Sequence, residues 1–174
     1  MKNILALSVI FTFGTNPGDI DSLRATVQME ATKGNTASGT LKLVQKGDTV
    51  SVSGKIEGLR ANGEHGFHVH EKGDCSSGDG MDTGGHFNPT SKAHGMHGHS
   101  ETHAGDMPSL KADANGVALV NFETTSISLL EGNPANAIGR GMIIHRDPDD
   151  FKTQPSGNAG PRISCGVVAW GKIH

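Results

Sequence analysis

The stretch that decides the fold is residues 40–56, which read TLKLVQKGDTVSVSGKI. Apolar and polar residues alternate over 40–44 and again over 49–56, and Lys46, Gly47 and Asp48 lie between the two runs. Alternation predicts strands with one buried face, because successive side chains of a strand point to opposite faces. A short connection containing glycine is typical of a tight turn. The stretch therefore predicts a β-hairpin.

Five further segments resemble short strands, at 24–32, 66–71, 116–124, 141–145 and 163–170. In the first of them, Ala25, Val27 and Met29 fall on one face. No segment has a convincing amphipathic helical period, and the chain contains 25 glycines, which favours many turns. Seven or eight short strands joined by turns predict an all-β, antiparallel sandwich or barrel.

Two long stretches, 72–109 and 146–161, have neither a strand nor a helix period. Irregular loops of this length inside a compact domain usually carry function. The chain has 174 residues and no hydrophilic linker, so we expect a single domain. Its net charge of -3 and the lack of a basic patch argue against nucleic-acid binding, and its charged content of 19% is typical of a folded protein.

The N-terminus has the pattern of a secretory signal. Lys2 precedes an apolar run over 4–13, which is too short to span a bilayer. We expect residues 1–21 to be a signal peptide with a short N-terminal segment, and residues 22–174 to form the domain. The mature protein would then be periplasmic or secreted, without stable membrane association.

The chain has two cysteines, Cys75 and Cys165. They could be free thiols in the core or form one disulfide that closes a long loop. In an oxidising compartment the disulfide is favoured.

Histidines are the most conspicuous chemical feature, since seven of the ten fall within residues 65–99. His68 and His70 occupy alternate positions of a predicted strand, so both side chains project from one face, as two ligands of one metal would. The following loop carries three more histidines and an aspartate that together could complete a tetrahedral zinc shell: His86, His94, His103 and Asp106. The alternative is a solvated histidine-rich loop that binds metal adventitiously.

Four motifs identify a family. They are GFHVHE at 66–71, GHFNP at 85–89, HAGD at 103–106 and GNAGPRISCGV at 157–167. In this order they closely resemble copper/zinc superoxide dismutases, and the similarity runs collinearly over about residues 23–169. The N-terminal segment and residues 147–158 are most similar to the exported bacterial branch. The resemblance implies an eight-stranded antiparallel Greek-key barrel with two long functional loops.

The resemblance also implies two metal ions per subunit that share one histidine. Copper would be held by His68, His70, His86 and His145. Zinc would be held by His86, His94, His103 and Asp106, with the imidazole of His86 deprotonated between the metals. The copper would convert superoxide to dioxygen and hydrogen peroxide by alternate reduction and reoxidation, and the zinc would be structural. Such an enzyme would protect the exported compartment from oxidative damage.

Further roles follow from the same resemblance. Cys75 and Cys165 match the intrasubunit disulfide, and Arg162 matches an arginine that guides the anionic substrate to copper. Asp149 matches an aspartate that links a copper-ligand histidine to a zinc-ligand histidine. Lys152 is a weaker candidate for steering, since a lysine common in the family just before residue 157 is replaced here by Pro155 and Ser156.

Some residues fall outside these matches. His65 is expected to support the loop rather than bind metal. Met96, His97 and His99 match no family ligand, so they would be solvated loop residues or would capture copper for delivery. Trp170 would pack on a barrel end or on a partner subunit.

Two alternatives to the enzyme remain, a copper carrier and a structural domain of a larger assembly. Related carriers usually lose copper-site histidines and gain a Cys-x-Cys pair or an extra metal domain, and neither change occurs here. A homodimer is compatible with the sequence but is not specified by it.

Overall fold

The computed structural model describes residues 22–171, so the predicted signal peptide at 1–21 lies outside the described residues. The strands of the main sheet are β1 (Ser22–Ala31), β2 (Ser38–Lys46), β3 (Thr49–Glu57), β5 (Phe67–His70), β7 (Ala118–Thr124), β8 (Gly141–His145), β9 (Arg162–Val167) and β10 (Ala169–Trp170). Two short strands, β4 (Glu64–His65) and β6 (Leu110–Lys111), form a separate pair. Within 22–171 the only helical element is a 3-10 turn, Met81–Thr83, and no helix there is long and apolar enough to cross a membrane.

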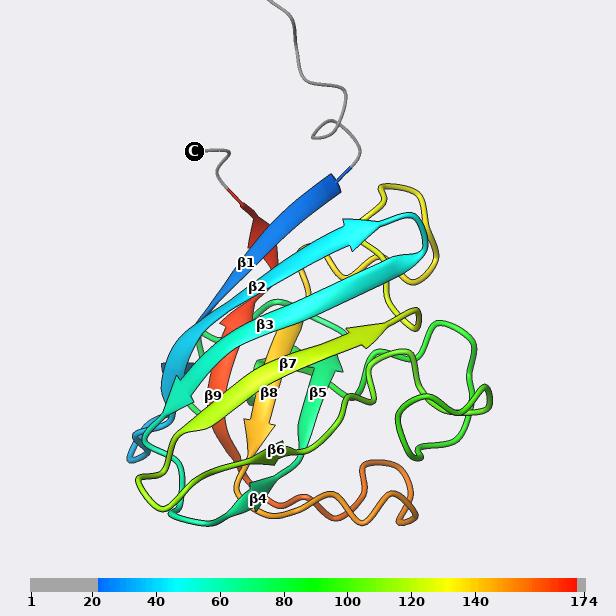
Figure 1. The fold of residues 1–174 in the computed structure, drawn as a ribbon. Helices are drawn as coiled ribbons and strands as arrows, with labels where there is room; N and C mark the ends of the chain where they lie inside the picture. Colours follow the sequence, from blue (N-terminus) through cyan, green and yellow to red (C-terminus); the bar gives the residue numbers. More distant parts are fainter. Residues whose placement is uncertain (1–21, 172–174) are drawn as a thin grey trace, which may run out of the picture.

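The eight-stranded sheet is antiparallel, in the order β5-β8-β9-β1-β2-β3-β7, with β10 paired to β1. It curls so that β1, β2, β3 and β7 form one wall and β9, β8 and β5 the other, while β4 and β6 lie at one end (Figure 1). In the sheet β3 is followed by β7, whereas in the chain β5 comes between them. The chain therefore crosses to the other wall between β3 and β5, returns between β5 and β7, and crosses again between β7 and β8. These crossings are the Greek-key connections, and the predicted architecture is confirmed.

Burial follows the alternation that the sequence predicts. Ala25, Val27 and Met29 are all buried on the inner face of β1. In the hairpin, Leu43 of β2 lies opposite Val52 of β3, and both are fully buried. The core therefore fills the space between the two walls, and it is continuous across them.

The strands β5 and β8 differ because every one of their residues is buried. On β5, Phe67 and Val69 pack into the core, whereas His68 and His70 point to the outer face. Loop residues pair with the free edge of β5: the N–H of Val69 donates to the carbonyl of Gly105, and the N–H of Phe87 donates to the carbonyl of Val69. The loops thus convert the outer face of β5 and β8 into a second buried region, in which the histidines lie.

Three details depart from the predicted strands. The last predicted strand is divided at Val168 into β9 and β10, because the N–H of Val168 donates to the carbonyl of Arg140 in a neighbouring loop. The two-residue strands β4 and β6 were not foreseen. A third irregular stretch, 125–140, connects β7 to β8 in addition to the two predicted long loops.

Candidate metal centre

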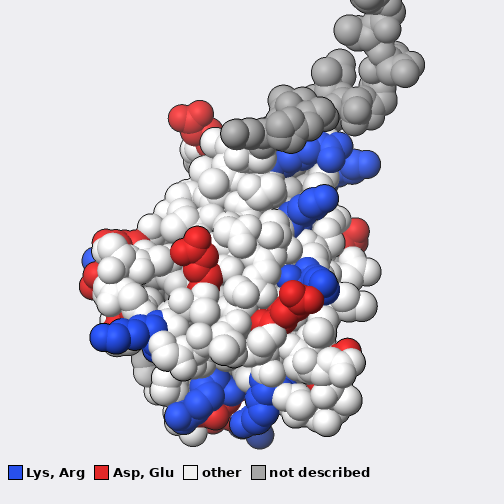
Figure 2. All heavy atoms as spheres, turned by 90° about the vertical axis from the view of Figure 1, so that its left-hand side faces the viewer, with Lys and Arg blue, Asp and Glu red and all other residues white. Residues whose placement is uncertain are grey.

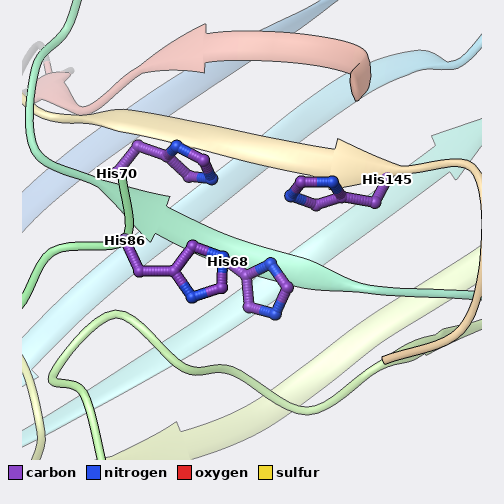
Figure 3. Close-up of side chains that lie close together, drawn as sticks. All are labelled: His68, His70, His86 and His145. Atoms are coloured by element: carbon purple, nitrogen blue, oxygen red, sulfur yellow. The ribbon is translucent and has the colours of Figure 1, made fainter. Parts of the chain in front are cut away.

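Strand pairing brings together histidines that are distant in sequence. In the antiparallel pair β5–β8, His68 lies opposite Ile143 and His70 opposite Gly141, and the N–H of His145 donates to the carbonyl of Gly66. Paired residues point to the same face, so His145 projects on the side of His68 and His70. His86 reaches this side from the loop, where it forms an isolated bridge with His70. Figure 3 shows the four rings gathered over β5.

These four histidines form the first cluster, His68, His70, His86 and His145. All four are buried, and each offers a ring nitrogen that lies within 4.8 Å of the other three. These nitrogens, His68 Nδ1 and the Nε2 atoms of the other three, have no hydrogen-bond partner. A buried polar atom without a partner is costly, and four that converge in one place indicate a common ligand. Imidazole nitrogen is a preferred ligand of copper and zinc.

The opposite nitrogen of each strand histidine is fixed by a hydrogen bond. His68 Nε2–H donates to Asp149 Oδ2 over 2.7 Å, His70 Nδ1–H to the carbonyl of Gly84 over 3.0 Å, and His145 Nδ1–H to the carbonyl of Gly160 over 2.9 Å. Such bonds select the tautomer whose free nitrogen points to the metal and fix the orientation of the ring.

The second cluster consists of His86, His94, His103 and Asp106, and all four are buried. Asp106 Oδ1 lies 3.0 Å from Nδ1 of His86, 3.0 Å from Nδ1 of His94 and 3.3 Å from Nδ1 of His103, and the Nδ1 atoms of His86 and His103 are 3.5 Å apart. Zinc bonds of about 2.0–2.1 Å to tetrahedral ligands imply edges of roughly 3.3–3.4 Å between donor atoms. The distances in this cluster are close to those edges, so the donor set fits a tetrahedral zinc ion.

His86 belongs to both clusters. Its Nδ1 faces Asp106 in the second cluster, and its Nε2 is one of the unpartnered atoms of the first. One imidazole can therefore ligate two metal ions at once, provided that it is deprotonated.

Asp149 links the two clusters through hydrogen bonds to one histidine of each. One carboxylate oxygen accepts from His68 and the other from His94 Nε2–H, over 2.9 Å. The residue is buried, and Gly157 packs against it. A side chain on Gly157 would collide with the Asp149 carboxylate and the His94 ring, and its φ of +66° also favours glycine.

Arg162 lies at the edge of the first cluster, opposite His145 in the β8–β9 register. Its guanidinium donates to the carbonyl of Gly84, which also accepts from His70, and to Thr83 Oγ1. The loop that supplies these acceptors is tied to β9 by the disulfide between Cys75 and Cys165, so of the two cysteine alternatives the disulfide is confirmed.

The ionisation of the rings differs between the clusters. Burial, aided by neighbouring histidines, lowers the pKa of His86 to about 4 and that of His145 to about 3, and it places the pKa of His70 well below its usual range. Burial also opposes protonation of His94, but hydrogen bonds to Asp106 and Asp149 outweigh it and raise the pKa of His94 to about 9. Burial raises the pKa of the carboxyl groups of Asp106 and Asp149, but hydrogen bonds from the histidines outweigh it and keep the pKa of both groups below the ordinary range.

The remaining histidines of the loop region lie outside both clusters. His65 is buried, and its Nδ1–H donates to the carbonyl of His145, so it contacts the main chain of a strand residue. His97 is half-buried and bonds to the main chain of Asp106, so it is not a solvated loop residue, whereas His99 is exposed. Lys152 is exposed on the last long loop, and Trp170 is 51% exposed on β10.

A contact of Gln154 with the second cluster was missed by sequence reasoning. The side-chain amide of Gln154 accepts from the main-chain N–H of His94 over 2.8 Å and donates to its carbonyl over 2.9 Å. This pair ties the last long loop to the second cluster. A glutamine in a polar loop gives no signal of such a contact.

Comparison with known proteins agrees with this geometry. Residues 37–168 match the family model described as copper/zinc superoxide dismutase (SODC). Superoxide dismutase [Cu-Zn] 2 of Aquifex aeolicus is 36% identical over 171 residues, covering 97% of this chain and 98% of the relative. Superoxide dismutase [Cu-Zn] of Paramecium bursaria Chlorella virus 1 is 34% identical over 176 residues, covering 97% and 91%.

Solved structures give the same result. The crystal structure of the clock protein EA4 superimposes with a TM-score of 0.77 at 36% identity, covering 90% of this chain and 99% of that one. A double mutant of a SOD-like protein from Bacillus subtilis gives a TM-score of 0.75 at 36% identity, covering 83% and 96%. On the match to the family model and these near full-length similarities, the chain belongs to the copper/zinc superoxide dismutase family.

Proposed function

We propose that the first cluster binds the catalytic copper and the second the structural zinc, and that the protein disproportionates superoxide into dioxygen and hydrogen peroxide. The observation that carries the assignment is the set of four buried, unpartnered imidazole nitrogens, one of which belongs to a ring shared with a tetrahedral donor set. Imidazoles suit a redox-active copper, whereas a closed shell of three nitrogens and one oxygen suits zinc, which has no redox chemistry.

Bound there, copper would supply one-electron chemistry, accepting an electron from one superoxide and giving it to the next. The protein's own groups would orient the ligand rings and supply a proton. Hydrogen bonds at the far nitrogens of His68, His70 and His145 hold the rings in place during turnover. When not bonded to metal, Nε2 of His86 can carry a proton and give it to the peroxide as it forms.

The positive charge that attracts the superoxide anion has to lie close to the site, because the protein as a whole is acidic. The net charge is -3, and acidic and basic side chains are interspersed on the face that Figure 2 shows. Arg162, whose guanidinium is anchored to Thr83 and Gly84, provides a fixed positive charge beside His70. A cleft with fixed cations can raise the association rate of an anion even on an acidic protein.

We also propose that the domain begins at residue 22 and that residues 1–21 direct export. A disulfide between Cys75 and Cys165 supports this, since disulfides persist in oxidising compartments such as the periplasm. Lys2 and the apolar run after it are typical of a signal peptide.

The assignment is tested with His145→Ala, which removes a ligand of the first cluster only. The variant is expected to retain zinc and its melting temperature while losing copper-dependent dismutation. The matched variant His99→Ala alters an exposed histidine outside both clusters and should behave like the wild type. Retained activity in His145→Ala would reject its role. Wild-type protein that holds both metals without turnover would favour the copper carrier.

A further inference from the structure

In the sequence His97 lies between His94 and His103, two members of the second cluster, but it is not itself a member. Its Nδ1–H donates to the main-chain carbonyl of Asp106 over 2.9 Å, since a carbonyl can only accept. The other contact of the ring is with Phe122 of β7, edge to face, with centroids 5.8 Å apart. Phe122 in turn packs on the fully buried Phe67, so the ring of His97 rests against the core.

Asp106 is nearly inaccessible, with 1% of its surface exposed, and all its acceptors are in use. Its Oδ1 faces the three histidines of the second cluster, and its Oδ2 accepts from the N–H groups of Gly95 and His103. The main-chain carbonyl remains, and within residues 22–171 the only donor bonded to it is His97. A buried carbonyl without a donor is costly, so the loss of His97 would drive this peptide to move toward water.

We propose that His97 is a positioning residue for the zinc half of the centre. By fixing the Asp106 peptide, its N–H sets the direction of the carboxylate oxygen that faces the three imidazoles. The inference rests on the proposed assignment of zinc to the second cluster. Removing a partner that orients a metal ligand in this way typically lowers metal affinity about 10–100-fold.

The test compares His97→Leu with His97→Asn in the full-length protein. The two side chains have nearly the same shape, but only asparagine carries an N–H that can replace Nδ1–H. Zinc affinity of the metal-free protein is measured by competition with a chelator of known affinity. We expect the leucine variant to bind zinc at least about tenfold more weakly and the asparagine variant to recover most of that loss. His99→Leu, at an exposed position of the same loop, is the control and should not change zinc affinity.

A second readout follows the geometry of the site. Co²⁺ bound at the zinc position gives visible absorption bands that report ligand geometry, and these should shift in His97→Leu and return in His97→Asn. Should the leucine variant not fold, His97→Phe gives the same comparison, because it keeps an aromatic ring against Phe122 without the donor.

Unchanged zinc affinity in the leucine or phenylalanine variant would overturn the proposal, as would an asparagine variant that recovers neither the affinity nor the spectrum. If the wild type itself bound no zinc tightly, the assignment of zinc to the second cluster would fail instead, so the two failures are distinguishable.

Discussion

Zinc binding to the metal-free protein is predicted to release about one proton from His94 at neutral pH. The ring of His94 lies between two carboxylates, with Nδ1 3.0 Å from Asp106 Oδ1 and Nε2 2.9 Å from Asp149 Oδ1. These hydrogen bonds outweigh burial and raise the pKa of His94 to about 9. In the metal-free protein at pH 7 the ring is therefore a cation, and a metal ligand has to be neutral at its donor nitrogen.

The size of the effect follows from this pKa. With a pKa of about 9, His94 is about 99% protonated at pH 7, so zinc displaces about one proton from it. With the unperturbed value of about 6.5, the fraction would be only about one quarter. The direction of the pH dependence follows from the same proton release. Zinc affinity should rise roughly tenfold per pH unit from about pH 6.5 to 9 and level off above.

The assay is titrant consumption at constant pH while zinc is added to the metal-free protein in weak buffer. Copper added afterwards should release a further proton if His86 becomes a shared imidazolate. It should release none from His70 or His145, because burial keeps the pKa of both far below neutrality. A zinc-linked release of one quarter of a proton or less at pH 7 would refute the reasoning about His94.

Three other predictions follow from single contacts. Replacing Cys75 and Cys165 by serine opens a loop closed over 90 residues and should cost about 2–5 kcal/mol of unfolding free energy, seen as a lower melting temperature; an unchanged midpoint would contradict this. Arg162→Ala should keep both metals, slow superoxide decay roughly 3- to 10-fold and weaken its dependence on ionic strength, whereas an unaltered rate and salt profile would exclude steering by this residue. Gly157→Ala should weaken zinc binding about 10–100-fold, because its Cβ would collide with the carboxylate and imidazole beside it. The control Gly139→Ala has a similar positive φ but open space around it, so equal losses in both variants would attribute the effect to backbone strain alone.

Local patterns were sufficient for most of the fold. The hairpin over β2 and β3 and the inner face of β1 depend on alternation and a turn, which are properties of neighbouring residues. The break at Val168 and the short strand β6 were not predictable in this way. Each is defined by main-chain bonds to a distant segment, and the sequence of the strand itself gives no sign of them.

The same division applies to the metal centre. His68, His70 and the histidines of the following loop could be proposed because a side chain that binds metal is visible in the sequence. The role of His145 and the division into two ligand sets came from the family resemblance. Their supports are less visible, since the partners of His70 and His145 are the carbonyls of Gly84 and Gly160, and every residue has a carbonyl. The contact of His97 with Asp106 was missed for the same reason.

Dismutation at a copper and zinc centre is checked by following superoxide decay with the purified protein and counting copper and zinc per chain on the same sample. We expect about one copper and one zinc per chain and a rate constant near the diffusional ceiling of about 10⁸–10⁹ M⁻¹s⁻¹, which superoxide dismutases are known to reach. Both metals bound with no decay above the metal-free control would contradict it.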